Sequence, residues 1–432
     1  MRFVSLLLLG LAATGVAAAQ TAPPPTLTLT LDDALARARA NGQQLLSADL
    51  AARIAHEDRV QAKAALLPNA QWLNSFIYTQ PNGTPSGVFV PNDGPHIYNN
   101  TANVHAEPYS LGRRADYQVA IAAEAVARAK VEIARRGLYS TVVQNYYSMV
   151  VAQRKVANAR LGLDETRRML DITQKQEAGG EVSHADVVKA QIQAVQRERD
   201  LQEAQLALDK ARIGFAVFLF PDFRQDFTVV DDLDRAPALP AFPEIQSLAQ
   251  QNNPDIRAAQ ATVTQQTFGI RSARSGYLPT LAFDYWYGIE ANQYALHDPE
   301  GHNLLGSSFQ VQLNVPVWNW GATRSKIRQA ELKLQQAKVD LTFTQRQLLA
   351  NLNSFYQEAQ VAAAQVASLK QSLDLSLESL RLTLLRYQAG EVTILELVDA
   401  QTTAVAARNA YDDGLSRYRL ALANLQTLTG SF

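Results

Sequence analysis

The sequence predicts a mostly α-helical chain that also contains membrane-type β-strands and is internally duplicated. Similar segments recur in both halves at nearly one offset. Apolar residues recur every seven positions over very long stretches, and the short segments between them alternate apolar and polar side chains. A compact domain of 432 residues does not hold helices of this length, so we expect an elongated molecule.

Composition excludes several classes of protein. Forty basic and forty-one acidic residues leave a formal charge of −1, so no basic surplus is present to neutralise phosphates and we expect no nucleic-acid partner. The chain has no cysteine, which excludes a disulfide scaffold, a thiolate metal site and a lipid-modified cysteine. Hydrophobic residues make up 47 % of the chain, enough for a large core.

The first nineteen residues have the pattern of an export signal. Arg2 is followed by an apolar core over 3–16 and by three alanines over 17–19, which form a small-residue cleavage site. A membrane anchor fits less well because the apolar core is short and is interrupted by Gly10 and Gly15. We therefore predict a signal peptide over 1–19.

The duplication defines two repeats. Gly180-Glu181-Val182-Ser183 returns as Gly390-Glu391-Val392-Thr393, and Ala65-Leu66-Leu67-Pro68 returns as Gly276-Tyr277-Leu278-Pro279. Several matches in one order and at nearly one offset indicate two halves with one fold. The Pro-rich stretch 236–243 joins them, so we predict a first repeat over 20–235 and a second over 236–432.

Each repeat begins with a shorter helix that ends at a proline. In the first repeat, Thr30 and Asp33 form a capping-box-like start, and helical periodicity runs from about Leu45 to Leu67 before Pro68. In the second repeat Pro254 opens the equivalent helix.

Heptads predict very long helices in the second part of each repeat. Leu334, Leu341 and Leu348 belong to a seven-residue ladder that is typical of coiled-coil packing. At about 1.5 Å per residue, the longest of these helices would extend roughly 100 Å, so we expect each long helix to pack along two shorter ones. The predicted long helices span 112–178, 183–219, 321–388 and 393–428.

Period-two alternation predicts a pair of strands after each proline. The expected bounds are about 70–80, 101–110, 280–291 and 307–317. In the last strand the apolar set is expected to face lipid and the polar set to face inward, with Leu313 near the middle of the strand. The apolar set is Phe309, Val311, Leu313, Val315 and Val317, and the polar set is Gln310, Gln312 and Asn314.

Four strands of this length match membrane strands but cannot close a barrel. An open edge in lipid would leave backbone groups unpaired, so the chain must associate with copies of itself. Three copies give twelve strands, and two copies give eight. The predicted interfacial aromatic girdle consists of Trp72, Tyr109, Trp286, Trp318 and Trp320. The alternative is a soluble β-layer with aromatic core residues.

These features resemble the TolC family of outer-membrane efflux proteins. The likeness is carried by the exported duplicated chain, by the Leu-Pro before each strand pair, and by the related stretches 179–191 and 389–401. The resemblance implies a homotrimer: a 12-stranded β-barrel in outer-membrane lipid, continued by a long α-helical barrel through the periplasm. It also implies two protein partners, a periplasmic adaptor and an inner-membrane pump.

The resemblance suggests a gate beside the second turn. Glu396 and Asp399 share a helix face, and in the family an acidic pair at this place constricts the periplasmic mouth. The alternative is a solvated helix face. Tyr387 matches the family's tyrosine before the turn glycine, whereas Val392 stands where the archetype has an arginine that helps hold the mouth shut.

The turns themselves are candidate docking sites. Gly179-Gly180 and Gly390 end long helices where left-handed geometry is needed. The resemblance adds docking of the adaptor at these helix tips. The tip residues are Gly179, Gly180, Glu181, Val182, Gly390, Glu391 and Val392.

No catalytic site is expected. The six histidines are scattered, and the chain has no phosphate-binding loop, paired metal-binding histidines or nucleophile elbow. We therefore predict a non-enzymatic protein without cofactor or metal site. The rival interpretation is a soluble periplasmic coiled-coil scaffold or adaptor.

Overall fold

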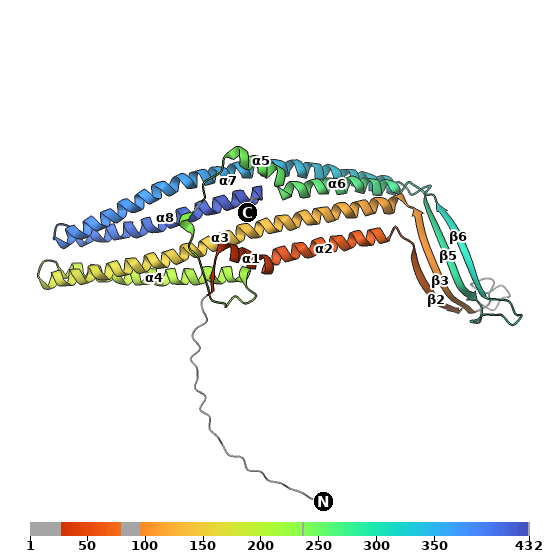
Figure 1. Cartoon of the computed structure of the whole chain (residues 1–432), viewed down its shortest axis with the longest axis horizontal. Coiled ribbons are helices and arrows are strands. Elements are labelled where there is room, and N and C mark those ends of the chain that lie inside the picture. The colour runs from red at the N-terminus through yellow and green to blue at the C-terminus, as the bar shows by residue number, and fades with distance from the viewer. Residues whose placement is uncertain (1–26, 79–95, 236, 431–432) are drawn as a thin grey trace, which may run out of the picture.

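The computed structural model describes residues 27–78, 96–235 and 237–430. The molecule is elongated, with its helices along one axis and a four-stranded sheet at one end (Figure 1). The predicted signal peptide lies outside the described residues. The main elements are α1 (Leu31–Asn41), α2 (Gln43–Ala64), β2 (Asn69–Tyr78), β3 (His96–Tyr109), α3 (Leu111–Ala178), α4 (His184–Leu219), α5 (Phe242–Asn252), α6 (Pro254–Ser275), β5 (Thr280–Ala291), β6 (Leu305–Asn314), α7 (Ala322–Gln388) and α8 (Ile394–Thr429).

Each long helix packs along two shorter ones. Toward the sheet the helices lie side by side in the order α2, α3, α6, α7, and toward the other end in the order α4, α3, α8, α7 (Figure 1). Hairpin α3–α4 and hairpin α7–α8 both turn at the end far from the sheet. The bounds of these four helices lie within one residue of the predicted ones.

Local signals place the helix starts. The Thr30 hydroxyl accepts a hydrogen bond from the Asp33 backbone N–H, and the Asp33 carboxylate accepts one from the Thr30 backbone N–H, which completes a capping box before α1. The Ser110 hydroxyl accepts from the Arg113 N–H at the start of α3. Asn253 caps α6, which has Pro254 at its first position.

The sheet is fully antiparallel, in the order β2-β3-β5-β6. The middle pair joins the first repeat to the second, so β2 and β6 are the two free edges. Because directly opposed residues share a face, the register gives one apolar and one polar face. The apolar face carries Val104, Phe283, Tyr285, Phe309 and Val311, and the polar face carries Asn103, His105, Asp284, Trp286 and Gln310.

Two predicted strand bounds need correction. β3 begins at His96 rather than at 101, because the polar run Asn99-Asn100-Thr101 continues its pairing with β2 despite weak strand propensity. β6 ends at Asn314, so Val315 and Val317 lie beyond it. Pro316 cannot donate to a strand partner. Leu313 is therefore at the end of the strand, and Phe309 is near its middle.

Sequence patterns did not reveal the central layer. β1 (Leu27–Leu29) pairs in parallel with β4 (Phe227–Val229), close to the middle of α3. Their side chains join Tyr146 and Phe215 in the largest buried cluster. Three-residue strands are too short for periodicity to be recognised.

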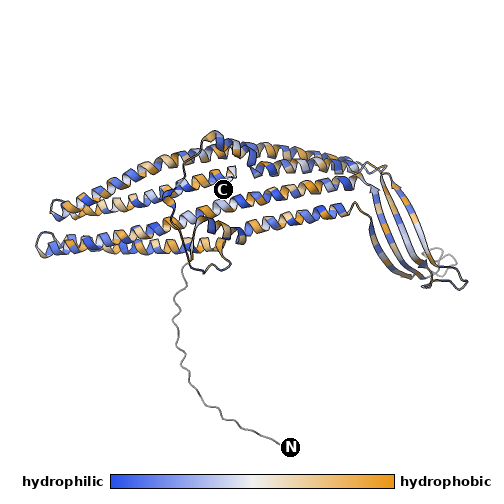
Figure 2. Cartoon of the chain, viewed as in Figure 1, coloured by the Kyte–Doolittle hydropathy of each residue, from blue (hydrophilic) through white to orange (hydrophobic). Residues whose placement is uncertain are grey.

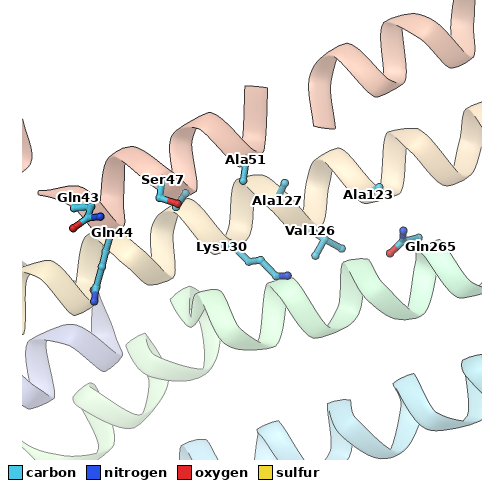
Figure 3. Close-up of a pocket in the computed structure, with 10 residues that line it drawn as sticks. Gln43, Gln44, Ser47, Ala51, Ala123, Val126, Ala127, Lys130 and Gln265 are labelled. Carbon is cyan, nitrogen blue, oxygen red and sulfur yellow. The ribbon is translucent and has the colours of Figure 1, made fainter. Parts of the chain in front are cut away.

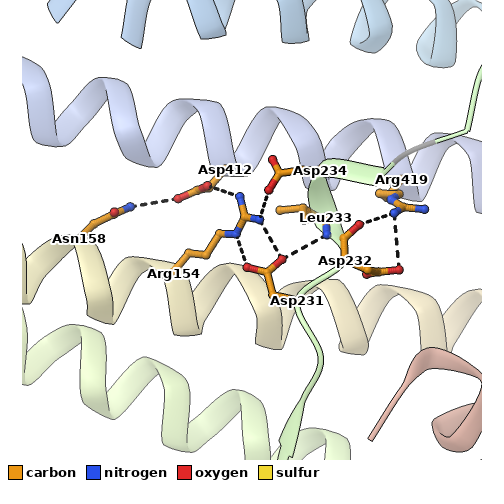
Figure 4. A network of polar contacts seen from close by, with 8 residues as sticks. All are labelled: Arg154, Asn158, Asp231, Asp232, Leu233, Asp234, Asp412 and Arg419. Carbon is orange, nitrogen blue, oxygen red and sulfur yellow. Dashed lines mark hydrogen bonds and ion pairs between the residues drawn. The ribbon is translucent and has the colours of Figure 1, made fainter. Parts of the chain in front are cut away.

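Arg154 of α3 links the segment after β4 to α8 (Figure 4). Its guanidinium pairs with Asp231 at 2.6 Å, with Asp234 at 2.6 Å and with Asp412 at 2.9 Å. Burial alone would lower the pKa of Arg154, but hydrogen bonds to the three carboxylates raise it. Arg419 of α8 also donates to the backbone carbonyl of Asp232. The two repeats are thus joined by ion pairs as well as by the chain.

Hydrophilic and hydrophobic residues alternate along every helix (Figure 2). Among the described residues, no helix is long and apolar enough to cross a bilayer.

Candidate functional site

The far ends of both hairpins have the same turn. Gly180 has φ 75° and Gly390 has φ 77°, in the left-handed region. The Glu181 N–H donates to the Gln176 carbonyl at 2.8 Å, and the Glu391 N–H donates to the Arg386 carbonyl at 2.9 Å. These bonds form the Schellman motif, in which the residue after the helix end has a left-handed backbone and is usually glycine.

Gly179 corrects one prediction about these turns. Its φ is −81°, so its backbone is right-handed and its conformation does not require glycine. The left-handed position is Gly180 alone, as Gly390 is alone in the second turn, where Ala389 takes the place of Gly179. The sequence already shows this difference, because Gly179-Gly180 in the first repeat is matched by Ala389-Gly390 in the second, where only the second glycine is kept.

Tyr387 is buried between the two hairpin tips, with 3 % of its surface exposed. Its hydroxyl lies 2.8 Å from the Thr173 hydroxyl of α3. Thr173 donates its own proton to the Met169 carbonyl at 2.9 Å, so Tyr387 is the donor in the hydroxyl pair. Burial raises the pKa of Tyr387, which keeps this proton in place.

The tip contains its own hydrophobic cluster. Tyr387 of α7 packs there with Met169 of α3, Ala190 of α4, and Ile394 and Leu397 of α8. Val392 is half-buried against the same cluster, so it contributes packing where the family's archetype has an arginine. The hairpins are therefore held together at the tip by apolar contacts and one hydroxyl pair.

Glu396 and Asp399 lie on the exposed face of α8 beside this cluster. The contact of Glu396 is a long one, 3.5 Å from the Thr393 hydroxyl. Within the described part of the chain, neither carboxylate has an ion pair. The structure thus brings the two predicted acids together on one surface and leaves their charges uncompensated.

The first hairpin differs at the equivalent positions. Asp186 accepts a hydrogen bond from the Ser183 hydroxyl at 2.8 Å and lies 3.4 Å from the Lys189 ammonium. The Ser183 bond lowers the pKa of Asp186. Nearby, His184 contacts Glu177 at 2.7 Å across the turn. The duplication therefore gives one neutralised tip and one acidic tip.

Other residues of the tips were not found from the sequence. Arg386 pairs with Glu391 at 3.5 Å across the second turn, and the Gln176 amide donates to the Tyr387 carbonyl at 3.4 Å. Thr173 and Gln176 contact residues more than two hundred positions away, which local patterns do not reveal. The predicted docking residues Glu181 and Glu391 are exposed, and Val182 is half-buried.

The predicted girdle residues on the strands do not all lie on the same face of the sheet. Trp72 lies on the apolar face and is exposed, and Tyr109 pairs with Leu281 on that face. Trp286 lies opposite Asn103 and Ser308 on the polar face, so it does not share a face with Trp72. Alternation with Tyr285 and Tyr287 explains this placement.

Trp318 and Trp320 follow β6, before α7, and form an edge-to-face pair with ring centroids 5.7 Å apart. They are 76 % and 89 % exposed. Trp320 has φ 54° and is followed by Gly321 at φ 81°. A left-handed tryptophan is a strained conformation, and here it holds a large apolar side chain outward.

The family model described as "Outer membrane efflux protein" matches residues 34–217 and 245–431, one match in each repeat. The chain belongs to the outer membrane efflux protein family. It is therefore a non-enzymatic outer-membrane efflux channel of the TolC type with a periplasmic extension, and the rival interpretation as a soluble scaffold is set aside.

Relatives of this outer membrane efflux protein include the cobalt-zinc-cadmium resistance protein CzcC of Cupriavidus metallidurans, which is 25 % identical over 75 % of each chain. Outer membrane protein TolC of Vibrio cholerae is 22 % identical over 91 % of this chain and 89 % of its own length. Pyoverdine export outer membrane protein OpmQ of Pseudomonas aeruginosa is 26 % identical over 93 % of this chain and 84 % of its own.

Solved structures show the same fold. The CmeC outer membrane channel of Campylobacter jejuni superposes with a TM-score of 0.80 at 17 % identity, covering 93 % of this chain and 85 % of that one. The CusC structure superposes with a TM-score of 0.79 at 18 % identity, covering 96 % of this chain and 95 % of that one.

Proposed function

We propose that this efflux protein works as a homotrimeric duct. In this proposal, three four-stranded sheets close a 12-stranded barrel in outer-membrane lipid, and the long helices continue it as an α-helical barrel into the periplasm. The hairpin tips meet a periplasmic adaptor that connects the duct to an inner-membrane pump.

The observation that carries the proposal is the position of the free edges. The order β2-β3-β5-β6 leaves β2 and β6 unpaired on their outer sides, and the order of the helices leaves α2 and α7 at the same two edges. Unpaired edges cannot remain open in lipid. Because the strands alternate in direction, β6 of one copy would lie antiparallel to β2 of the next.

Exposed apolar side chains support the same contact along the helices. On α2 they include Leu50 and Ile54, at 57 % and 63 % exposure. On α7, Leu332, Val339 and Phe343 lie on one helix face at 50 %, 59 % and 59 % exposure. Association that covers both rows would remove this surface from water.

The apolar face of the sheet supports a lipid-facing exterior, and the polar face a lumen. The Trp318–Trp320 pair lies where the sheet meets the helices, the level at which amphipathic rings favour a membrane interface. We assign these two residues, with Trp72 and Tyr109, to the interfacial aromatic girdle of the barrel.

The adaptor is proposed to contact the exposed turn residues, among them Glu181 and Glu391. The relatives are named for metal resistance, pyoverdine export and protease secretion, so likeness to them does not specify one cargo.

The trimer is tested by its mass. Purified protein in mild detergent is expected to have the mass of three chains. Phe343→Asp should dissociate it, because it introduces a charge at the proposed contact between copies. Thr342→Asp is the matched control, since successive helix residues point about 100° apart. A wild-type monomer that retains the native helical content would contradict the proposal.

The gate is tested by ion selectivity. We propose that Glu396 and Asp399 of three copies form a ring of six carboxylates at the periplasmic mouth and favour cations there. Glu396→Gln with Asp399→Asn is expected to lower the ratio of cation to anion permeability and to weaken block by divalent cations from the periplasmic side. Single-channel recordings in planar bilayers measure both properties.

A matched control exists in the first hairpin. Asp186→Asn with Lys189→Gln changes the equivalent positions but removes no net charge, so selectivity should stay at the wild-type value. If the Glu396/Asp399 variant also keeps wild-type selectivity and wild-type divalent block, these residues are part of a solvated face and not of the gate.

A further inference from the structure

A recess of about 790 Å³ lies where α2 and α6 flank α3 in the half of the molecule near the sheet (Figure 3). Side chains from all three helices line it. The floor is formed by small residues, chiefly Ala48, Ala51, Ala123 and Ala127. Its volume is within the range of about 300–1,000 Å³ that small-molecule sites occupy.

The polar groups around this floor can all donate hydrogen bonds. Gln44, Ser47 and Gln265 contribute amide and hydroxyl groups, and Lys130 contributes an ammonium group (Figure 3). The lining includes no aspartate or glutamate. Within the described part of the chain, no hydrogen bond or ion pair is formed by the Lys130 ammonium. The recess therefore combines an uncompensated positive charge with a small apolar floor.

The same face of α3 continues away from the recess. Gln144 follows Lys130 at a multiple of seven residues, so both lie on one stripe of a supercoiled helix. Val142 and Tyr146 lie on the opposite side of α3 and are buried in the central cluster, which farther along the helix also includes Val151.

Both flanking helices contribute to one hollow over α3, so the recess lies on the concave side of the three-helix arc. In the proposed trimer the concave side is the interior of the duct. Further along α3, Lys155 is neutralised by Asp413 at 2.8 Å. Lys130 and Lys155 therefore differ in whether they can attract an anion.

We propose that the recess is a weak binding site for organic anions with a compact apolar body, which pause there as they pass through the duct. The Lys130 ammonium and the amide donors hold the anionic group, and the alanine floor accepts the apolar part. This inference rests on the proposed trimeric duct, because it requires the concave face to line the lumen.

The test uses the full-length protein in planar bilayers with naphthalene-2-sulfonate as the probe, added from the extracellular side. The probe is expected to reduce the single-channel current, and neutral naphthalene-2-sulfonamide to do so much less. Lys130→Gln should raise the half-blocking concentration about three- to fivefold, the effect of losing one solvent-exposed charge contact. Lys130→Arg should keep the wild-type value.

Two further variants separate this recess from general lumen charge. Lys155→Gln, further along α3, should leave the half-blocking concentration unchanged because its charge is already paired. Ala127→Leu keeps every charge but places a larger side chain in the alanine floor of the recess. It should therefore raise the half-blocking concentration of the probe, as Lys130→Gln does. If the Lys130→Gln and Ala127→Leu variants both form conducting trimers that the probe blocks at the wild-type concentration, the proposed binding site in the recess is wrong. Absence of any conducting trimer would instead overturn the proposed duct.

Discussion

Replacing Arg136 with methionine is expected to lower the free energy of unfolding by about 2–4 kcal/mol, through loss of charged hydrogen bonds to carbonyl groups that are then left without donors. The Arg136 guanidinium donates to the carbonyls of Thr427 and Leu428 at 3.0 and 3.3 Å, and to the Asn252 carbonyl at 2.7 Å. These carbonyls end α8 and α5, where helix dipoles favour a positive charge.

The location explains the size of this effect. Arg136 belongs to α3 of the first repeat, and all three acceptors belong to the second. Burial lowers the pKa of Arg136, yet an arginine stays charged at any physiological pH. Arg136→Lys should recover part of the loss, because one ammonium group cannot reach both helix ends in the way that a planar guanidinium does.

Denaturant unfolding followed by the helical circular dichroism signal measures the change, at one protein concentration because an oligomer's stability depends on it. Arg135→Gln is the matched control. Among the described residues, Arg135 pairs with Glu132 alone, at 3.0 Å on the exposed helix surface, so its loss should cost less than about 0.5 kcal/mol. Equal stability of the Arg136→Met variant and wild type would show that solvent replaces the guanidinium at both helix ends.

Local periodicity predicted the parts of this fold that repeat over many residues. Heptads located α3, α4, α7 and α8 to within one residue, and the glycine turns marked their ends. Alternation located β5, in which Leu281, Phe283, Tyr285 and Tyr287 share one face. These patterns are strong because each element packs one continuous face against its neighbours.

Contacts between distant residues were beyond such patterns. Arg136 with the ends of α5 and α8, Arg154 with three aspartates, and Thr173 with Tyr387 all join segments that are far apart in the chain. Each needs the fold before its partners can be named. The acidic pair Glu396 and Asp399 was predicted from its shared helix face together with the family resemblance. The position of Trp286 on the polar face was not foreseen, because the aromatic residues were counted without separating the two faces of the strand.

The corrected end of β6 changes where a charge will be most costly in the sheet. With the strand at Leu305–Asn314, Phe309 is near the middle, and its ring stacks on Phe283 with centroids 6.0 Å apart. Phe309→Arg is expected to cost about 2–4 kcal/mol, the penalty for arginine on the lipid face at mid-membrane depth. Leu313→Arg, at the end of the strand, should cost only about 0–1 kcal/mol, as at a membrane interface.

Gln310→Arg is the control for the opposite face. Gln310 pairs with Asp284 on the polar face, so an arginine there would face the lumen and lie near a carboxylate. Folding yield into lipid vesicles and reversible guanidinium unfolding of the inserted protein measure all three variants. The expected order of destabilisation is Phe309→Arg, then Leu313→Arg, then Gln310→Arg. If Gln310→Arg prevents insertion while Phe309→Arg is tolerated, the apolar face lines the interior and the proposed barrel is inverted.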